Sequence, residues 1–451
     1  MYLLLLHLSA SKEYIMKKLT AIIVGAGHRA LLYAEYALVK PDELEIVGVA
    51  EPDSTKRAHA ANVHKIPQER CFTTAEELSR VPKFADFVIN GTMDKLHVPT
   101  SVPLLKAGYD ILLEKPFATD KNEMRHLVKT AQKLKRRIAI CHVLRYAPFY
   151  AGIKQRILAG DIGDIMNIQT TENVSYHHVA AAFIRGKWGT KKYGGSSFLM
   201  AKCCHDLDLI TWLKSGIHPS RVASMGSRMF FIPEKAPVGS GMHCLTDCPK
   251  EVEAACLYSA RKHYVDHNWW PFYVWDFNDK FKDQTLPSSE ERIRRLSDPA
   301  NPYGRCVWKT DGDIIDHQSV VIEFADGATA THNLVSGASK SERNIQIIGT
   351  KGEIRGAFES GKFTIVRMDP RPGHEHAEEV VDTNISGDFS GLSGAHGGGD
   401  ARLIADFVRV MRGEQPSFSY TGIEDSVYGH ITGFLADEAM AKRTEMTIPR
   451  I

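Results

Sequence analysis

The chain has 451 residues, of which 43% are hydrophobic and 24% charged, a composition typical of globular proteins with room for two domain cores. Its 56 basic and 54 acidic side chains give a formal net charge of +2, so no global field favours nucleic acid or an anionic membrane. Without a secretory signal, the eight cysteines are expected to be mostly reduced thiols. These features favour a small-molecule partner, with no nucleic acid and no membrane.

The first sixteen residues differ from the rest of the chain. Their apolar run lacks a basic n-region and is broken by His7, so it does not match a signal peptide, and we expect a disordered leader over 1–16. Later stretches are too short or too polar to cross a bilayer, which predicts a cytoplasmic protein.

From residue 17 to 145, short apolar runs alternate with amphipathic helical stretches. This alternation is typical of a doubly wound parallel sheet covered by helices on both faces. The predicted strands are 19–24, 44–50, 84–90, 109–113 and 137–142. Residues 121–135 are a predicted helix with Thr119 or Asp120 as its N-cap. The pattern predicts an α/β nucleotide-binding domain over 17–145.

The pattern changes after Arg145, where strand-like runs cluster and few helices interrupt them. The predicted strands are 165–174, 222–231, 319–324, 328–334, 344–348 and 363–368, and the predicted helices are 206–213, 401–411 and 424–442. This predicts an α+β domain over 146–451 with an open, mostly antiparallel sheet. The stretch 233–302 is too long for a connector, and we expect an inserted subdomain or lid there.

A glycine-rich turn, Gly25-Ala26-Gly27-His28-Arg29-Ala30, follows the first predicted strand and opens a helix. Gly25 allows the tight turn, Gly27 lets the backbone approach a pyrophosphate, and Ala30 permits close helix packing. Glu51 ends the second predicted strand, where a carboxylate accepts hydrogen bonds from a ribose diol and repels a 2′-phosphate. The sequence therefore favours NAD, while Lys56 and Arg57 nearby leave NADP open.

A charged pair, Glu114-Lys115, stands between an apolar strand and Pro116. Such charges are costly to desolvate without a partner or a task, so the pair indicates a functional site.

Five segments in chain order carry a resemblance to a known family. They are 21–30, Thr92-Met93-Asp94-x-x-His97, Glu114-Lys115-Pro116, Arg145-Tyr146-x-Pro148 and His205-x-x-Asp208. Together they resemble the glucose-fructose oxidoreductase, inositol dehydrogenase and rhizopine catabolism (Gfo/Idh/MocA) family. The resemblance implies an NAD(P)-dependent oxidoreductase with a Rossmann domain and an open-sheet α+β domain, assembled as a homodimer or homotetramer.

The resemblance also implies roles for single residues. Lys115 would lie beside the nicotinamide and the reacting hydroxyl, where a cation stabilises developing negative charge, and His205 would relay the proton. The predicted cofactor-binding residues are Gly25, Ala26, Gly27, His28, Arg29, Glu51, Thr92, His97, Glu114 and Lys115.

The chain departs from the family pattern beside His205. Many members carry Asp four residues earlier, where this chain has Ala201, so the identity of the catalytic base stays open. Lys202 resembles a subgroup in which a lysine precedes the histidine; it is either a third catalytic residue or a partner of Asp206. Among residues of sugar-pocket type, which include Trp188 and His396, we predict that His178 and Arg185 contact substrate.

Three thiols and an imidazole lie close in sequence at His243, Cys244, Cys248 and Cys256. Zinc takes such ligands, but the spacing lacks the paired C-x-x-C knuckles of structural zinc sites, and buried cysteines also pack as small hydrophobic residues. We therefore include no metal among the predicted site residues, and the role of these cysteines stays open.

The predicted activity is a dehydrogenase that takes a hydride from a secondary hydroxyl of a sugar, glycoside or cyclic polyol. One alternative is redox-assisted cleavage of a glycoside with recycling of the cofactor. Another is a non-catalytic, NAD-linked sugar sensor, against which the retention of Lys115 and His205 argues.

Overall fold

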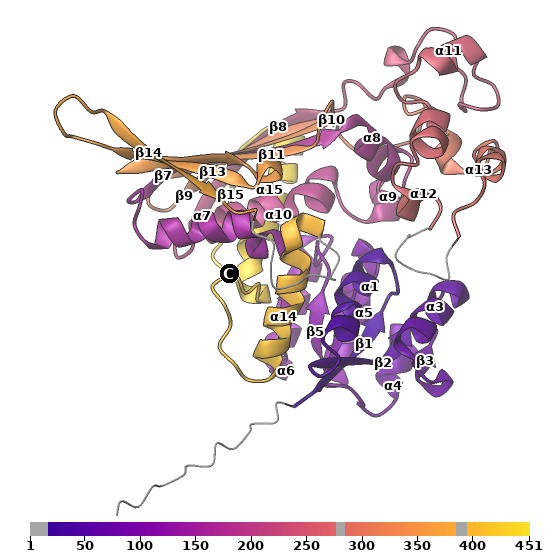
Figure 1. Ribbon diagram of the computed structural model, residues 1–451, viewed down its shortest axis with the longest axis horizontal. Helices are drawn as coiled ribbons and strands as arrows, with labels where there is room; N and C mark the ends of the chain where they lie inside the picture. The colour runs from indigo at the N-terminus through magenta and orange to yellow at the C-terminus, as the bar shows by residue number, and fades with distance from the viewer. Residues whose placement is uncertain (1–16, 277–284, 385–394) are drawn as a thin grey trace, which may run out of the picture.

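The computed structural model describes residues 17–276, 285–384 and 395–451, so the predicted leader lies outside the described residues. A parallel sheet forms one lobe and a larger sheet the other, with a layer of helices between them (Figure 1). No helix within the described ranges combines the length and apolar character that a bilayer crossing requires.

The first lobe is built on six parallel strands in the order β3-β2-β1-β4-β5-β6. The first two predicted strands, 19–24 and 44–50, have the expected bounds, and this doubly wound order confirms the predicted Rossmann-type fold. The strands are β1 (Leu19–Val24), β2 (Leu44–Ala50), β3 (Cys71–Phe72), β4 (Phe87–Asn90), β5 (Asp110–Leu113) and β6 (Ile138–Ile140).

Helices flank this sheet, and α3, α4 and α6 begin at polar side-chain caps. Asp120 accepts hydrogen bonds from the backbone N–H groups of Asn122 and Glu123, at 2.7 and 2.9 Å, so it and not Thr119 caps α6. The helices of this lobe are α1 (His28–Ala34), α2 (Tyr36–Val39), α3 (Ser54–His64), η1 (Gln68–Arg70), α4 (Ala75–Arg80), η2 (Asp94–Leu96), α5 (His97–Lys106) and α6 (Lys121–Leu134).

The second lobe contains a nine-stranded sheet in the order β14-β13-β12-β11-β7-β10-β9-β8-β15. Only its pairing of β7 with β10 is parallel, which confirms the mostly antiparallel sheet. The strands are β7 (Ile165–Ser175), β8 (Pro219–Ser227), β9 (His317–Phe324), β10 (Thr329–Ala338), β11 (Glu342–Gly349), β12 (Gly352–Ala357), β13 (Lys362–Met368), β14 (His376–Asp382) and β15 (Met446–Thr447). The short helical turn η8 (Phe358–Ser360) lies between β12 and β13.

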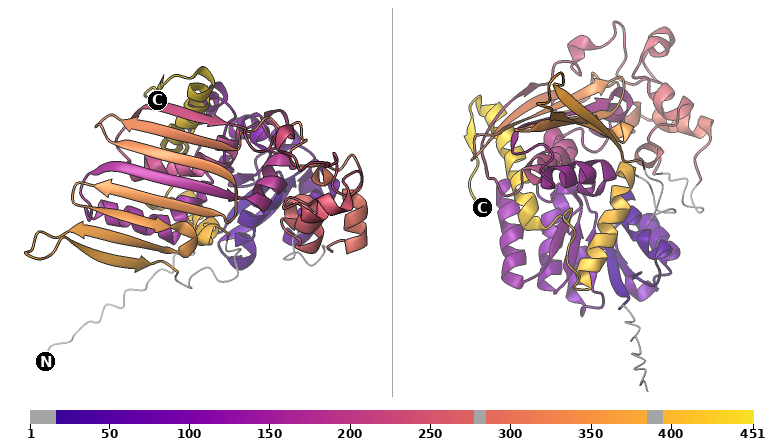
Figure 2. Two further views of the ribbon diagram at one scale, coloured as in Figure 1. Left: turned by 90° about the horizontal axis from the view of Figure 1, so that it is seen from above. Right: turned by 60° about the vertical axis from the view of Figure 1, so that its left-hand side comes forward.

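Helices cover one face of this sheet, and the other face is open, as Figure 2 shows with the strands seen face on. Alternating burial along β9 and β11 matches a sheet with one covered face. The helices of this lobe are η3 (Val143–Tyr146), α7 (Pro148–Leu158), α8 (Tyr176–His178), η4 (Val179–Ile184), α9 (Lys191–Gly194), α10 (Phe198–Leu213) and α15 (Ile423–Lys442).

Among the predicted boundaries that are wrong, two have a clear local cause. The helix predicted over 206–213 begins at Phe198, because the hydroxyl of Ser197 accepts the backbone N–H of Met200 and caps an earlier first turn. The strand predicted over 222–231 ends at Ser227, because the carboxylate of Asp316 takes the backbone N–H of Phe230, at 2.6 Å, out of the ladder.

The C-terminal part of the chain returns to the first lobe. Helix α14 (Gly399–Met411), which follows the turn η9 (Ala395–Gly398), packs the ring of Phe407 on Phe87 at 5.0 Å between centroids (Figure 1). Further on, Gly422 pairs with Ala139 at the edge strand β6. The lobe predicted over 17–145 is thus completed by residues from 399 onward.

An insertion of residues 228–316 connects β8 to β9 and carries its own small core around Tyr264, Trp275 and Leu296. It lies beside the first lobe, and Phe272 stacks on His28 with 4.5 Å between the ring centroids. Its elements are η5 (Pro233–Lys235), α11 (Lys250–Ala255), η6 (Lys262–Asp266), α12 (Pro271–Val274), α13 (Ser289–Leu296) and η7 (Pro302–Gly304).

Candidate active site

A cleft of about 580 Å³ lies between the two lobes at the carboxyl ends of β1, β2 and β4. Ligands bind at this edge of open α/β sheets. The structure brings most of the predicted site residues to its wall: Gly25, Gly27, His28, Arg29, Glu51, Thr92, Glu114, Lys115, His178, Lys202 and His205. Three predicted residues, Ala26, His97 and Arg185, are absent from this wall.

The glycine turn has the geometry that the sequence requires of it. Gly25 adopts φ of +77°, and a Cβ there would lie 2.8 Å from the backbone nitrogen of Thr92. Gly27 is the N-cap of α1 and brings no side-chain hydrogen bond to the first turn. At Gly91 a Cβ would lie 2.8 Å from that of Ala30, so the small third residue permits close packing. The turn leaves room for a phosphate at the start of α1.

Glu51 is fixed against this turn. Its Oε2 accepts the backbone N–H of Ala26 at 2.7 Å, and its Oε1 accepts that of Asp53 at 2.9 Å. Ala26 therefore contacts Glu51 through its backbone and does not lie on the wall of the cleft; its role in cofactor binding stays a prediction. The side chain of Arg57 bonds the carbonyl of Pro52 at 3.2 Å, whereas Lys56 does line the cleft.

His97 holds two loops together and does not reach the cleft, which corrects the prediction that it binds cofactor. Its Nδ1 lies 2.7 Å from the carbonyl oxygen of Pro116, and its Nε2 lies 2.9 Å from that of Thr92. The imidazole is buried, so it positions the Thr92 loop against the segment that carries Lys115.

Glu114 is the centre of a buried charge network. Its Oε1 accepts hydrogen bonds from Nε of Arg29 at 2.8 Å and from the hydroxyl of Tyr33 at 2.7 Å. Burial alone would raise the pKa of this carboxyl, but the positive charges of Arg29 and Lys115 lower it below its usual value. Arg29 also donates a hydrogen bond to Asp400 of α14, so its guanidinium connects α1 to the C-terminal part of the chain.

A carboxylate–imidazole pair that the sequence did not reveal stands at the edge of this network. Asp400 Oδ2 lies 2.9 Å from Nδ1 of His396, and the imidazole lines the cleft. Despite burial, Arg29 and His396 lower the pKa of Asp400 to about 2. The ring of His396 lies 6.0 Å from that of His205.

Lys115 and His205 meet in the cleft from opposite lobes. The ammonium group of Lys115 donates to the backbone carbonyl of Ala201 at 2.8 Å, one helical turn before His205. Burial, followed by the charge of Lys115, lowers the pKa of His205 well below its usual value and keeps the imidazole neutral at pH 7. With Ala201 in place of a carboxylate, Nδ1 of His205 is buried without a hydrogen-bond partner among the described residues.

Lys202 pairs with Glu172 of β7 and not with Asp206. Its Nζ lies 3.1 Å from Oε1 of Glu172, whose Oε2 lies 2.6 Å from Nε of Arg343. Arg343 also lies 3.1 Å from Oδ1 of Asp206. The four charges form an alternating buried chain that holds Lys202 on the wall of the cleft.

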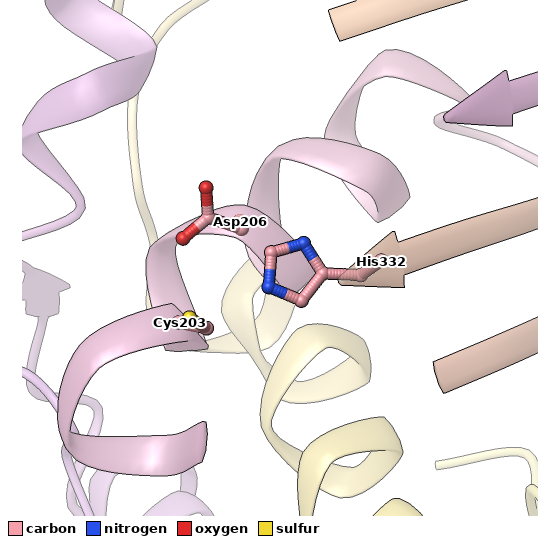
Figure 3. Close-up of side chains that lie close together, drawn as sticks. All are labelled: Cys203, Asp206 and His332. Carbon is pink, nitrogen blue, oxygen red and sulfur yellow. The ribbon is translucent and has the colours of Figure 1, made fainter. Parts of the chain in front are cut away.

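At the end of this chain, Cys203 and His332 lie close to Asp206 (Figure 3). One ligand atom of each lies within 4.8 Å of the others. However, Nδ1 of His332 lies 2.9 Å from the hydroxyl of Thr170, and the guanidinium of Arg343 already neutralises Asp206. The one carboxylate of the group is therefore already paired, and we interpret the group as part of the buried ion-pair network.

His178 and Arg185 separate in the structure. His178 lines the cleft and stacks on Trp270 with 4.1 Å between ring centroids. Arg185 follows η4 and is buried against the insertion, where Nε donates to the carbonyl of Arg305 at 2.6 Å and Nη2 donates to that of Tyr258 at 2.7 Å. This corrects the prediction that Arg185 contacts substrate.

Several residues on the cleft wall were not among the predicted site residues: Asp94, Lys187, Trp188, Tyr273, Arg343 and His396. Trp188 and His396 carried a signal in their residue types. Tyr273 and Arg343 carried none, because the insertion and β11 reach the cleft only through the tertiary fold.

The fold and the cleft define an oxidoreductase with a nucleotide-binding Rossmann domain. Residues 19–142 match the family model described as an oxidoreductase family with an NAD-binding Rossmann fold, and residues 154–234 match the C-terminal alpha/beta domain of the same family. Both models, N-terminal and C-terminal, are those of the Gfo/Idh/MocA oxidoreductase family, and they match the chain in the same order. The predicted family, enzyme class and NAD-binding domain are thereby confirmed.

Relatives agree with this assignment. The chain is 25% identical over 368 residues to YteT of Bacillus subtilis (strain 168), an oxidoreductase by name, covering 79% of this chain and 80% of YteT. It is 26% identical over 210 residues to an inositol 2-dehydrogenase of Corynebacterium glutamicum (strain R), which covers 46% of this chain and little more than half, 57%, of that protein.

Solved structures share the fold. Levoglucosan dehydrogenase, in complex with NADH and levoglucosan, superposes with a TM-score of 0.66 at 17% identity, covering 96% of this chain and all of that one. An NAD-binding oxidoreductase from Klebsiella pneumoniae gives the same TM-score of 0.66 at 15% identity, with 96% and 100% coverage.

Proposed function

We propose that the chain oxidises a secondary hydroxyl of a sugar, glycoside or cyclic polyol by transferring its hydride to NAD. The observation that carries the proposal is the approach of a lysine ammonium and a neutral imidazole, Lys115 and His205, in the cleft that also holds the glycine turn and Glu51. When bound, NAD supplies the hydride acceptor.

The cofactor would be held by residues along one edge of the parallel sheet. The turn at Gly25 and Gly27 suits the pyrophosphate, and Glu51 offers its carboxylate to the adenosine ribose. Glu114 and Thr92 line the next part of the cleft. Lys56 on the same wall keeps use of NADP within the proposal.

Lys115 would stabilise the negative charge that develops on the substrate oxygen. Its ammonium group is already oriented by the carbonyl of Ala201 at 2.8 Å, so little reorganisation is needed. Lys202, held by Glu172, would donate a second hydrogen bond to the substrate.

His205 would take the hydroxyl proton, because burial keeps its imidazole neutral and therefore able to accept one. His396, oriented by Asp400 at 2.9 Å, is a second acceptor on the same wall. This pair supplies the carboxylate–imidazole arrangement that is missing at Ala201.

A sugar or polyol substrate is supported by the composition of the remaining wall. Trp188, Tyr273 and His178 offer ring faces, and Arg343 and Lys202 offer hydrogen-bond donors, a combination typical of carbohydrate sites. Relatives named for inositol and levoglucosan support the same class.

The test is NADH formation with a panel of sugars, glycosides and inositols. Lys115→Met and His205→Asn should lower kcat/KM on the order of 10²–10⁴-fold. Lys129→Met, an exposed lysine on α6, is the matched control and should leave activity unchanged. Full activity of both site variants would refute the assigned roles.

The same panel separates the alternatives. Redox-assisted glycoside cleavage gives release of the aglycone without net NADH, and the additional proton acceptor at His396 favours testing it. A sugar sensor binds NAD and ligand with no turnover of either.

We also infer a cytoplasmic homodimer or homotetramer. The open face of the nine-stranded sheet, with Met225 and Val321 exposed by 81% and 48%, supports contact between copies. Sedimentation of the purified protein at several concentrations tests this assembly.

A further inference from the structure

We propose that Cys244, Cys248, Cys256 and Cys306 bind one zinc ion that fixes the insertion over the cleft. The four side chains line a single small cavity, of about 20 Å³, inside the insertion. This site is separate from the NAD cleft and does not depend on the proposed reaction.

Tertiary pairing brings two distant cysteines together. His243 and Arg305 form an antiparallel bridge, in which the backbone N–H of Cys244 donates to Gly304 at 2.9 Å and that of Cys306 donates to Met242 at 2.8 Å. Cys306 thereby joins the cysteines that lie close in sequence. With it the donor set reaches four sulfurs, one of the ligand sets of closed tetrahedral zinc sites.

A buried cation without a carboxylate partner stands against these thiols. Arg185 is 3% exposed, and its guanidinium donates to two backbone carbonyls, to the hydroxyl of Tyr264 at 3.3 Å and to Sγ of Cys244 at 3.4 Å. No described acidic residue forms an ion pair with it at 4.0 Å or less. Four thiolates around a divalent ion carry a net charge of −2, which would supply the counter-charge.

Backbone donors are also directed at the sulfurs. The N–H of Tyr258 donates to Sγ of Cys256 at 3.3 Å, and the N–H of Trp308 bonds Cys306 in the same way, each from two residues downstream. Hydrogen bonds of this kind orient thiolate ligands and stabilise their charge. On the same wall, Nε2 of His243 is buried without a partner among the described residues.

The size of the cavity selects a single ion. A volume of about 20 Å³ holds one water-sized particle and excludes an iron–sulfur cluster. In the part of the chain that the structure describes, no three of the four sulfurs lie within 4.8 Å of one another. Tetrahedral coordination of zinc requires distances of about 3.8 Å between the sulfurs. Rotation of the cysteines between staggered rotamers closes them on the ion. Sulfur-rich tetrahedral sites select zinc over magnesium or calcium.

The insertion also supplies aromatic residues at the cleft, so a zinc ion in the insertion would affect the cleft. Trp270 and Tyr273 belong to the insertion, and they pack on His178 and line the cleft, respectively. The insertion's core is small, and a metal is a common way to stabilise such a core. Zinc would hold these aromatic rings in place.

Elemental analysis of the purified wild-type protein is the first test. We expect one zinc per chain, with eight free thiols after denaturation in a chelator. Absence of any metal, or a loss of two thiols to a disulfide between these cysteines, would overturn the proposal. Because this measurement uses no variant, it does not depend on how well variants fold.

Variants and cobalt exchange identify the ligands. Cys306→Ser and Cys248→Ser should lose the ion, whereas Cys71→Ser, a partly exposed cysteine of the first lobe, and His243→Ala should retain it. Cobalt in place of zinc should show strong thiolate-to-metal charge transfer and tetrahedral ligand-field bands. Retention of the ion by Cys306→Ser, or its loss in His243→Ala, would refute this ligand set.

Discussion

The buried ion pair between Arg145 and Asp208 joins two of the sequence motifs that identified the family. Nε and Nη2 of Arg145 donate to the two carboxylate oxygens at 2.7 and 2.6 Å, and the two residues are 2% and 0% exposed. Asp208→Asn would leave the guanidinium buried beside a neutral amide. The expected cost is about 3–5 kcal/mol in the free energy of unfolding. This is a large part of the 5–15 kcal/mol typical of a domain.

Urea unfolding followed by circular dichroism measures this cost. The double variant Arg145→Met with Asp208→Leu removes both charges. Its loss of unfolding free energy should be smaller than the sum of the losses in the two single variants. Glu291→Gln, in an exposed pair with Arg294 at 2.7 Å, is the control and should leave the unfolding midpoint unchanged. If Asp208→Asn unfolds at the wild-type midpoint, the pair does not stabilise the fold and the reasoning is wrong.

Three further predictions concern cofactor, packing and pH. Glu51→Ala should weaken NAD binding about tenfold or more and NADP binding less, because the ribose acceptor is lost; an unchanged preference in fluorescence titration would contradict this. Gly429→Ala places a Cβ 2.8 Å from the Cα of Asp208 and should cost about 1–3 kcal/mol in thermal unfolding; a stability equal to wild type would show that α10 and α15 can separate freely. Burial lowers the folded-state pKa of His142 and His430 well below 6.5, so only the unfolded chain takes up their protons as pH falls through 6.5. Stability should therefore fall below pH 6.5 by about 1.4 kcal/mol per pH unit for each histidine, and His430→Gln should reduce that slope.

Five of the six strands of the parallel lobe could be predicted because their signals are local; the two-residue strand β3 could not. The bounds of β1 and β2 agree with their apolar runs, and the cap at Asp120 agrees with the start of α6. Strand β14 escaped prediction because His376–Asp382 is largely exposed and has no apolar face. The return of α14 to the first lobe escaped because no local pattern states which sheet a helix covers.

The site divides in the same way. The glycine turn, Glu51 and Lys115 were found because each chemistry needs its residue at a fixed place relative to a strand. The partners of Arg29 and Arg185 could not be found, because Asp400 and Cys244 approach them only through the tertiary fold. Cys306 was left out of the cysteine group for this reason.

The chain crosses between its halves more than once, and this limits how the halves can be studied or engineered. The hydroxyl of Thr421 donates a hydrogen bond to the carbonyl of Ile140. Leu403 and Phe407 of α14 pack in one core with the strands of the first lobe. A fragment that ends at residue 145 would expose those apolar strands to water, and we expect it to precipitate. The remaining fragment would expose the apolar face of α14. Swapping nucleotide preference between relatives therefore calls for grafts that carry residues 399–422 along with the first lobe.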